Sequence, residues 1–260
     1  MPQIALETIN VEYSLDSSAG EDRPVLVLSN SLGTTMSMWD SQITALTAKY
    51  RVLRYNTRGH GQSSKPSGAY TIAQLGQDVI ELMNALNIPR AYFCGLSMGG
   101  MIGTYLAINA QERFEKIILC NTNAFTAQPD FWDKRISILH AEGVAAIADG
   151  VMARFFSPAF TASSPQIVAD FKASLVATPV DGYASCCAAI RDMDFRGQLQ
   201  NIRVPTLVIA GTKDEASPPE NGQYLAKQIP NAKYKEIGAA HISNIEAPAE
   251  FSDAVISFLQ

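Results

Sequence analysis

Short apolar runs, most of them ending in polar residues or glycine, alternate with amphipathic segments along much of the chain. Runs of this kind are typical of strands buried on both faces of a parallel sheet. They occupy residues 25–30, 51–56, 91–95, 116–121, 205–211 and 232–237, and two earlier strands are predicted at 4–8 and 11–15, joined by a turn at residues 9 and 10. Apolar residues at helical spacing predict a helix over 71–86, and further helices are predicted at 98–108, at 219–228 and in the last dozen residues. This alternation predicts an α/β protein with a mostly parallel, doubly wound sheet.

The middle of the chain breaks the alternation. Residues 124–196 contain several helical segments and no convincing strand. We therefore expect an α/β core formed by residues 1–123 and 197–260, with 124–196 inserted as a helical cap. Ligands of such sheets bind at the carboxyl ends of the strands, where a cap excludes water and shapes a pocket.

Composition narrows the class of protein. The 260 residues are 47% hydrophobic and 17% charged, enough to build a sizeable core. A net charge of −5 argues against nucleic acid or an anionic membrane as partner, although a site can still be locally positive. No apolar run approaches the roughly 18 residues of a membrane span, and the first residues do not resemble a signal peptide. We expect a cytoplasmic protein.

The four cysteines give no sign of a disulfide or a metal site. Cys94 and Cys120 lie in apolar runs and are expected to be buried. Cys186 and Cys187 are adjacent, so a disulfide between them would be strained, and free thiols are expected. No cluster of cysteine and histidine has metal-ligand spacing. We expect neither a metal nor an organic cofactor.

Ser97 is the strongest candidate for chemistry. It lies in G-L-S-M-G at 95–99, which matches G-x-S-x-G between a predicted strand and a predicted helix. In that setting the serine occupies a strained turn where only glycine fits nearby. The following helix directs its N-terminal N–H groups toward the hydroxyl and favours negative charge there. Ser97 is therefore predicted to be a nucleophile.

A serine nucleophile needs a base, and the chain has three histidines. His60 lies in the turn R-G-H-G and His140 in the helical block, where structural and surface roles are expected. His241 follows the predicted strand 232–237 and precedes the last helix, so it can reach the same edge of the sheet as Ser97. We therefore expect His241 to be the base.

An acid should orient the histidine. Asp214 follows the buried run 205–211, whereas its neighbour Glu215 is expected to point elsewhere. Asp192 and Asp194 come earlier, near the end of the helical block. The order Ser97, Asp214, His241 is that of the α/β-hydrolase triad. An oxyanion hole should use the N–H of Met98 and a second N–H from the loop at 29–39.

These motifs together make the sequence resemble the α/β-hydrolase superfamily along nearly its full length. The stretches SNSLGTTMSMWD, RYNTRGHGQSS, GLSMGG, AGTKDEASPP and AAHISNIEAP occur in family order. Many members have His-Gly where this chain has Asn30 and Ser31. Aligning on Trp39 places the second oxyanion donor at Leu32.

Within the superfamily, the chain resembles the 3-oxoadipate enol-lactonases in SNSLGT, GLSMGG, FWDKRI and CCAAIRDMDFR. The resemblance implies a serine hydrolase that opens a small anionic enol-lactone in aromatic-acid catabolism. A buried substrate carboxylate needs a cation. The cap offers Lys134, Arg135, Arg154 and Arg191. Trp132 and Arg135 lie three residues apart on a predicted helix, so we expect Trp132 to wall the pocket and Arg135 to bind the carboxylate.

Other activities use the same triad. A carboxylesterase, a carbon–carbon bond hydrolase and a cofactor-free perhydrolase would differ from a lactonase only in the pocket. A dehalogenase or an epoxide hydrolase normally has aspartate at position 97. A non-catalytic ligand receptor on this fold can retain the triad, so the triad alone does not exclude it.

Overall fold

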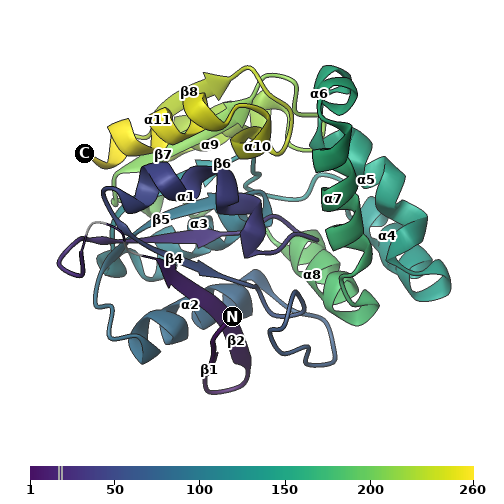
Figure 1. Ribbon diagram of the computed structural model, residues 1–260, viewed down its shortest axis with the longest axis horizontal. Coiled ribbons are helices and arrows are strands. Elements are labelled where there is room, and N and C mark those ends of the chain that lie inside the picture. The colour runs from purple at the N-terminus through teal and green to yellow at the C-terminus, as the bar shows by residue number, and fades with distance from the viewer. Residues whose placement is uncertain (17, 19) are drawn as a thin grey trace.

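The computed structural model describes residues 1–16, 18 and 20–260. Within this part of the chain an eight-stranded sheet has the order β1-β2-β4-β3-β5-β6-β7-β8 (Figure 1). Strands β1 and β2 are antiparallel to their neighbours, and every pairing from β4 to β8 is parallel. The predicted mostly parallel sheet is confirmed. The strands are β1 (Gln3–Ala5), β2 (Asn10–Asp16), β3 (Val25–Ser29), β4 (Arg51–Tyr55), β5 (Ala91–Leu96), β6 (Phe114–Cys120), β7 (Thr206–Gly211) and β8 (Lys233–Ile237).

The first predicted strand is too long. Strand β1 ends at Ala5, and β2 already begins at Asn10. The Leu6 N–H donates to the Ile9 carbonyl at 2.7 Å, so residues 6–9 form the turn. The apolar residues in the run 4–8 therefore belong partly to a turn and not wholly to a strand.

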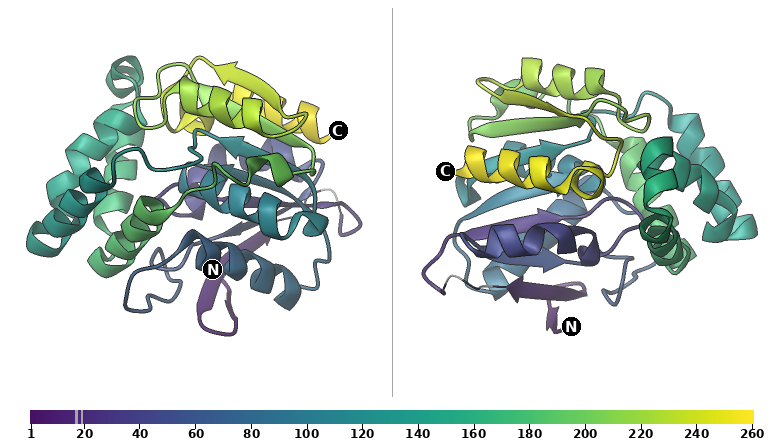
Figure 2. Two further views of the ribbon diagram at one scale, coloured as in Figure 1. Left: turned by 180° about the vertical axis from the view of Figure 1, so that it is seen from behind. Right: turned by 45° about the horizontal axis from the view of Figure 1, so that its top comes forward.

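Helices cover both faces of the sheet, which explains why β3 and β7 are buried along their whole length. Figures 1 and 2 show α1 and α11 on one face, with α2, α3 and α9 on the other. Thr71 caps α2 in a capping box with Gln74. These helices and the short ones near them are α1 (Asp40–Thr47), α2 (Ile72–Ala85), α3 (Met98–Asn109), α9 (Pro219–Gln228), α10 (Ser243–Glu246), α11 (Pro248–Leu259), η1 (Met36–Trp39), η2 (Gln111–Arg113) and η4 (Leu199–Asn201).

The segment 124–196 is helical and lies beside the sheet at one end of the molecule (Figure 1). Its two ends meet, because the Phe195 N–H donates to the Ala124 carbonyl at 2.9 Å. The backbone of Gly182 approaches that of Gly59 so closely that a side chain on either would overlap the other. We propose that this segment is a cap inserted into the core. Its helices are α4 (Pro129–Glu142), η3 (Val144–Ile147), α5 (Ala148–Phe155), α6 (Pro158–Ser163), α7 (Pro165–Val176) and α8 (Val180–Asp192).

The four cysteines are buried free thiols. The predicted burial of Cys94 and Cys120 and the predicted free thiols of Cys186 and Cys187 are confirmed. Cys94 and Cys120 lie side by side on β5 and β6, with their sulfur atoms 3.8 Å apart. Among the described residues, no single helix has the length and apolar character to cross a bilayer. Helices α7 and α8, which are bent by 95° at their junction, pass that test together by length and composition alone.

Candidate active site

Ser97 occupies the sharp turn between β5 and α3. Its φ of 58° and ψ of −115° are strained for a residue with a side chain. The Ser97 N–H donates to the Cys120 carbonyl at 2.8 Å, and Thr122 Oγ1 donates to the Ser97 carbonyl at 2.7 Å. A side chain at Gly95 would overlap the Gly99 carbonyl, and one at Gly99 would overlap a carbonyl of β3. The glycines of the motif therefore allow the turn, and neighbouring strand ends hold it.

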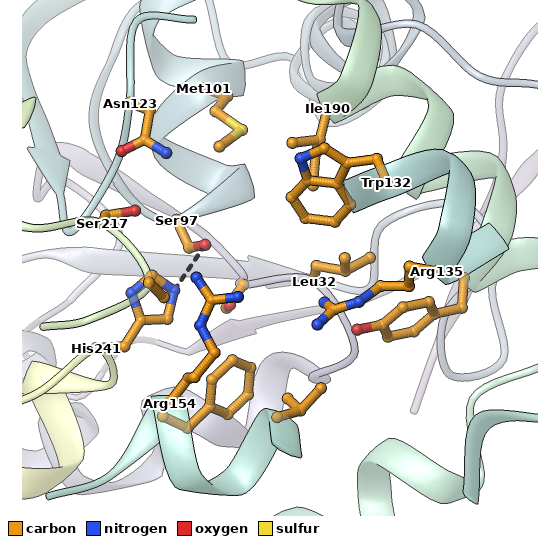
Figure 3. A pocket seen from close by; sticks show the side chains of 15 residues that line it. Leu32, Ser97, Met101, Asn123, Trp132, Arg135, Arg154, Ile190, Ser217 and His241 are labelled. Atoms are coloured by element: carbon orange, nitrogen blue, oxygen red, sulfur yellow. Dashed lines mark hydrogen bonds between the residues drawn. The ribbon is translucent and has the colours of Figure 1, made fainter. Parts of the chain in front are cut away.

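A hydrogen-bonded series connects Ser97, His241 and Asp214. Figure 3 shows the first of its two bonds, between Ser97 and His241. The His241 Nε2 atom lies 2.9 Å from Ser97 Oγ, and His241 Nδ1 lies 2.8 Å from Asp214 Oδ2. With the Nδ1 proton donated to the carboxylate, Nε2 is free to accept the serine proton. Asp214 and His241 follow β7 and β8, whose carboxyl ends lie at the same edge of the sheet as that of β5. The structure thus brings together three side chains that are distant in sequence.

The Asp214 carboxylate is held by three further donors. Its Oδ1 accepts the N–H groups of Ala216 and Ser217, each at 2.8 Å, and its Oδ2 accepts Asn121 Nδ2 at 3.0 Å. Asn121 ends the apolar run of β6 with a positive φ of 48°. The sequence reasoning missed this residue, although a polar residue at the end of a buried strand marks the same edge as the triad.

The competing acids and histidines lie elsewhere. Glu215 and His140 are exposed. His60 is buried, and its Nε2 accepts the Gly33 N–H at 2.9 Å. Asp192 and Asp194 are exposed, and they pair with Arg191 and Arg196 respectively.

Two backbone amides are predicted to form an oxyanion hole. In the described part of the chain, neither the Leu32 N–H nor the Met98 N–H has a protein acceptor. The loop before Leu32 is anchored by Asn30, whose side chain donates to the Tyr55 carbonyl at 2.7 Å and accepts Trp39 Nε1 at 2.9 Å. The Asn30 carbonyl also accepts the Gly99 N–H at 3.0 Å, which joins this loop to the serine turn.

A cavity opens above Ser97, and Trp132 and Arg135 lie on its wall (Figure 3). The Arg135 guanidinium stacks on Trp132, with 5.3 Å from Cζ to the ring centroid. Arg154 from α5 lines the same cavity. The other lining residues are Ser31, Leu32, Ser97, Met101, Asn123, Val151, Phe155, Tyr183, Ile190, Ala216, Ser217 and His241.

Neither of the two cavity arginines forms an ion pair with a carboxylate of the described residues, although Asp214 and Glu215 are near enough to raise the pKa of Arg154. Both are half-buried, and burial together with the neighbouring Arg135 lowers the pKa of Arg154. Arg191 instead pairs with Asp133 and Asp192, and Lys134 is exposed. The two cavity arginines make the cavity suited to an anion.

These features define the class of protein. The chain belongs to the α/β hydrolase fold family, whose model matches residues 24–248. It is 46% identical over 234 residues to 3-oxoadipate enol-lactonase 2 of Acinetobacter baylyi, covering 90% of this chain and 88% of the relative. It is 37% identical over 247 residues to 3-oxoadipate enol-lactonase 1 of the same organism, covering 95% and 92%.

A solved structure of another enol-lactonase is also similar to this protein. The enol-lactonase from Burkholderia xenovorans LB400 superposes with a TM-score of 0.97 at 45% identity, covering 99% of both chains. The predicted superfamily and fold class are confirmed. Among the described residues, no group of three or more histidine, cysteine, aspartate or glutamate side chains is arranged to hold a metal ion.

Proposed function

We propose that this protein is a 3-oxoadipate enol-lactonase, which opens the enol-lactone of 3-oxoadipate to 3-oxoadipate through an acyl-enzyme. The observation that carries the proposal is the hydrogen-bonded series Ser97–His241–Asp214 beneath a cavity lined by Arg135 and Arg154. The two enol-lactonases of Acinetobacter baylyi and the Burkholderia xenovorans structure support the choice of an enol-lactone as substrate.

Acylation uses the triad. Ser97 Oγ attacks the lactone carbonyl carbon while His241 Nε2 takes the hydroxyl proton, and the Asp214 carboxylate stabilises the imidazolium. The Leu32 and Met98 N–H groups hold the oxyanion of the tetrahedral intermediate. Losing one such donor costs about 3–4 kcal/mol in enzymes where it has been measured. Collapse of the intermediate breaks the ring C–O bond and leaves the acyl group on Ser97.

Deacylation reuses the same groups. The expelled enolate stays tethered to the acyl chain, and His241 returns its proton to it before the enol relaxes to the ketone. An enolate is a better leaving group than a simple alkoxide, so the ring opens without a further acid. Water, deprotonated by His241, then attacks the acyl carbon and releases 3-oxoadipate.

The cap supplies recognition of the anionic substrate. Arg135 pairs with the substrate carboxylate, and Trp132 forms the wall on which that guanidinium stacks. Arg154, which lies on α5, adds a second positive charge to the cavity. Trp132 and Arg154 also line a neighbouring surface cavity, and we propose that an anion reaches Ser97 from that cavity.

The test compares wild type with Ser97→Ala on the enol-lactone of 3-oxoadipate and on neutral esters such as 4-nitrophenyl acetate. Ser252→Ala is the matched control, because that hydroxyl is buried but bonds the Pro248 carbonyl on α11. We expect kcat/KM to be highest for the anionic lactone, and turnover to vanish only in Ser97→Ala.

Other outcomes separate the alternatives. Faster turnover of neutral esters than of the lactone would indicate a carboxylesterase. Carbon–carbon bond hydrolysis or perhydrolysis as the main activity would equally contradict the proposal. Tight binding of the lactone without any turnover by wild type would indicate a receptor.

A further inference from the structure

Three buried side-chain atoms in the described part of the chain have no hydrogen-bond partner. They are Ser31 Oγ, Thr57 Oγ1 and Asn244 Oδ1. A buried hydroxyl without a partner costs about 1–3 kcal/mol, so each requires a physical reason. Of the three residues, Ser31 is the one that lines the cavity above Ser97. A ligand in that cavity is therefore the natural partner of its hydroxyl.

The backbone of Ser31 is fixed, which limits where the hydroxyl can go. The Ser31 N–H donates to Met38 Sδ at 3.3 Å. The Ser31 carbonyl accepts both the N–H and the hydroxyl of Thr34, at 3.2 Å and 2.8 Å. Only rotation about the Cα–Cβ bond remains to the side chain, and alanine would fit the same backbone without leaving a polar atom unpaired.

Ser31 also lies next to the groups that receive the acyl oxygen. It directly precedes Leu32, whose N–H has no acceptor among the described residues. The Asn30 carbonyl, which belongs to the peptide bond with Ser31, accepts the Gly99 N–H at 3.0 Å. Gly99 lies two residues beyond Ser97. The two guanidinium groups of the cavity, in contrast, come from α4 and α5. Ser31 thus belongs to the oxyanion side of the cavity.

We propose that Ser31 Oγ donates a hydrogen bond to the acyl oxygen of the substrate as that oxygen becomes an oxyanion, beside the Leu32 and Met98 N–H groups. The hydroxyl keeps its proton throughout and forms no covalent bond. The inference rests on the proposed function only in that the reaction is acyl transfer at Ser97. It holds for any ester or lactone that the enzyme accepts.

The experiment uses Ser31→Ala and Ser31→Gly, with Thr57→Val as the matched control. Thr57 carries the same kind of buried, unpartnered hydroxyl but does not line the cavity. We expect both Ser31 variants to lower kcat about 10- to 100-fold on 4-nitrophenyl acetate and on the anionic lactone alike, which is the range for one hydrogen bond to a charged group. KM should stay within about twofold, because the bond strengthens only as charge develops. Thr57→Val should keep the wild-type kcat.

Thermal stability provides the second readout. Since the hydroxyl has no partner in the free protein, Ser31→Ala should melt at the wild-type temperature or above it. An unchanged kcat would overturn the proposal. So would a kcat loss accompanied by a lower melting temperature, because that pairing indicates a structural role.

A rise in KM confined to the anionic lactone would also overturn it, because the hydroxyl would then bind the carboxylate. The assay with 4-nitrophenyl acetate tests the role of Ser31 separately from the proposed lactonase function. If wild type hydrolyses the ester but not the enol-lactone, the lactonase assignment fails while the role of Ser31 is still tested.

Discussion

Replacing His60 should change how the stability of the protein depends on pH. His60 is 1% exposed, and its Nε2 accepts the Gly33 N–H at 2.9 Å. Its Nδ1 faces the Arg58 carbonyl at 3.3 Å, which suits a neutral ring protonated on Nδ1. Burial lowers the pKa of His60 from its ordinary value of 6.5 to about 4, against the opposing effect of the Arg58 carbonyl. Protonation would place a donor against the Gly33 N–H and a charge in an unsolvated site.

The size and sign of the effect follow from that pKa. The unfolded chain binds a proton at His60 below pH 6.5, whereas the folded protein does so only below about 4. Stability is therefore fully present above pH 6.5 and is lost as the pH falls toward 4. One pKa unit corresponds to 1.36 kcal/mol, so this single group should remove about 2.5 kcal/mol between pH 7 and pH 4.5.

The assay is urea denaturation of wild type and His60→Gln at both pH values. Glutamine does not titrate, and its Oε1 can accept the Gly33 N–H in place of Nε2. The variant should therefore lose about 2.5 kcal/mol less stability than wild type between pH 7 and pH 4.5. His140→Gln is the control, because it makes the same substitution at a histidine that is exposed on α4. Identical losses in wild type and His60→Gln would refute the reasoning.

Four further substitutions test the site. Arg135→Gln and Arg154→Gln should each raise KM for the anionic lactone about tenfold or more, with KM for 4-nitrophenyl acetate within about twofold. Equal changes for both substrates in steady-state kinetics would argue against anion binding. Asn121→Ala removes a donor from the Asp214 carboxylate and should lower kcat about tenfold at constant KM, whereas a wild-type kcat would show that the other donors suffice. Gly99→Ala forces a methyl group into the β3 backbone and should cost about 3 kcal/mol or more in thermal or urea unfolding. A wild-type melting temperature would contradict that overlap.

The sheet was predictable because its central strands are buried on both faces. Their continuous apolar runs are local patterns that need no knowledge of the fold. Helix α1 was not predicted, and its buried side chains explain why. Two of the three are Gln42 and Thr47, and Gln42 is buried because it bonds Asn244 from the far end of the chain. No hydrophobic periodicity identifies a helix that is held by a polar contact over that distance in sequence.

The candidate site could likewise be predicted only where the sequence carries a local signal. Ser97, Asp214 and His241 each follow a strand, so a topological rule about strand ends places them at one edge. Trp132 and Arg135 share one helix, and their spacing alone predicts that they lie together. Arg154 had no such local signal. It lines the same cavity as Arg135 only because α4 and α5 both border that cavity. The spacing of residues within one helix does not predict which residues of another helix lie near it.

Helix α5 also connects the proposed anion-binding cavity to His241, the proposed base. Arg154 lines the cavity, and the next residue, Phe155, packs on the His241 imidazole with 5.5 Å between ring centroids. The Phe155 carbonyl accepts the Ile242 N–H at 3.0 Å, so the backbone beside His241 is bonded to the same helix. A displacement of α5 would therefore move a cavity cation and disturb the histidine together. We therefore expect the geometry of the proposed triad to depend on α5 staying in place.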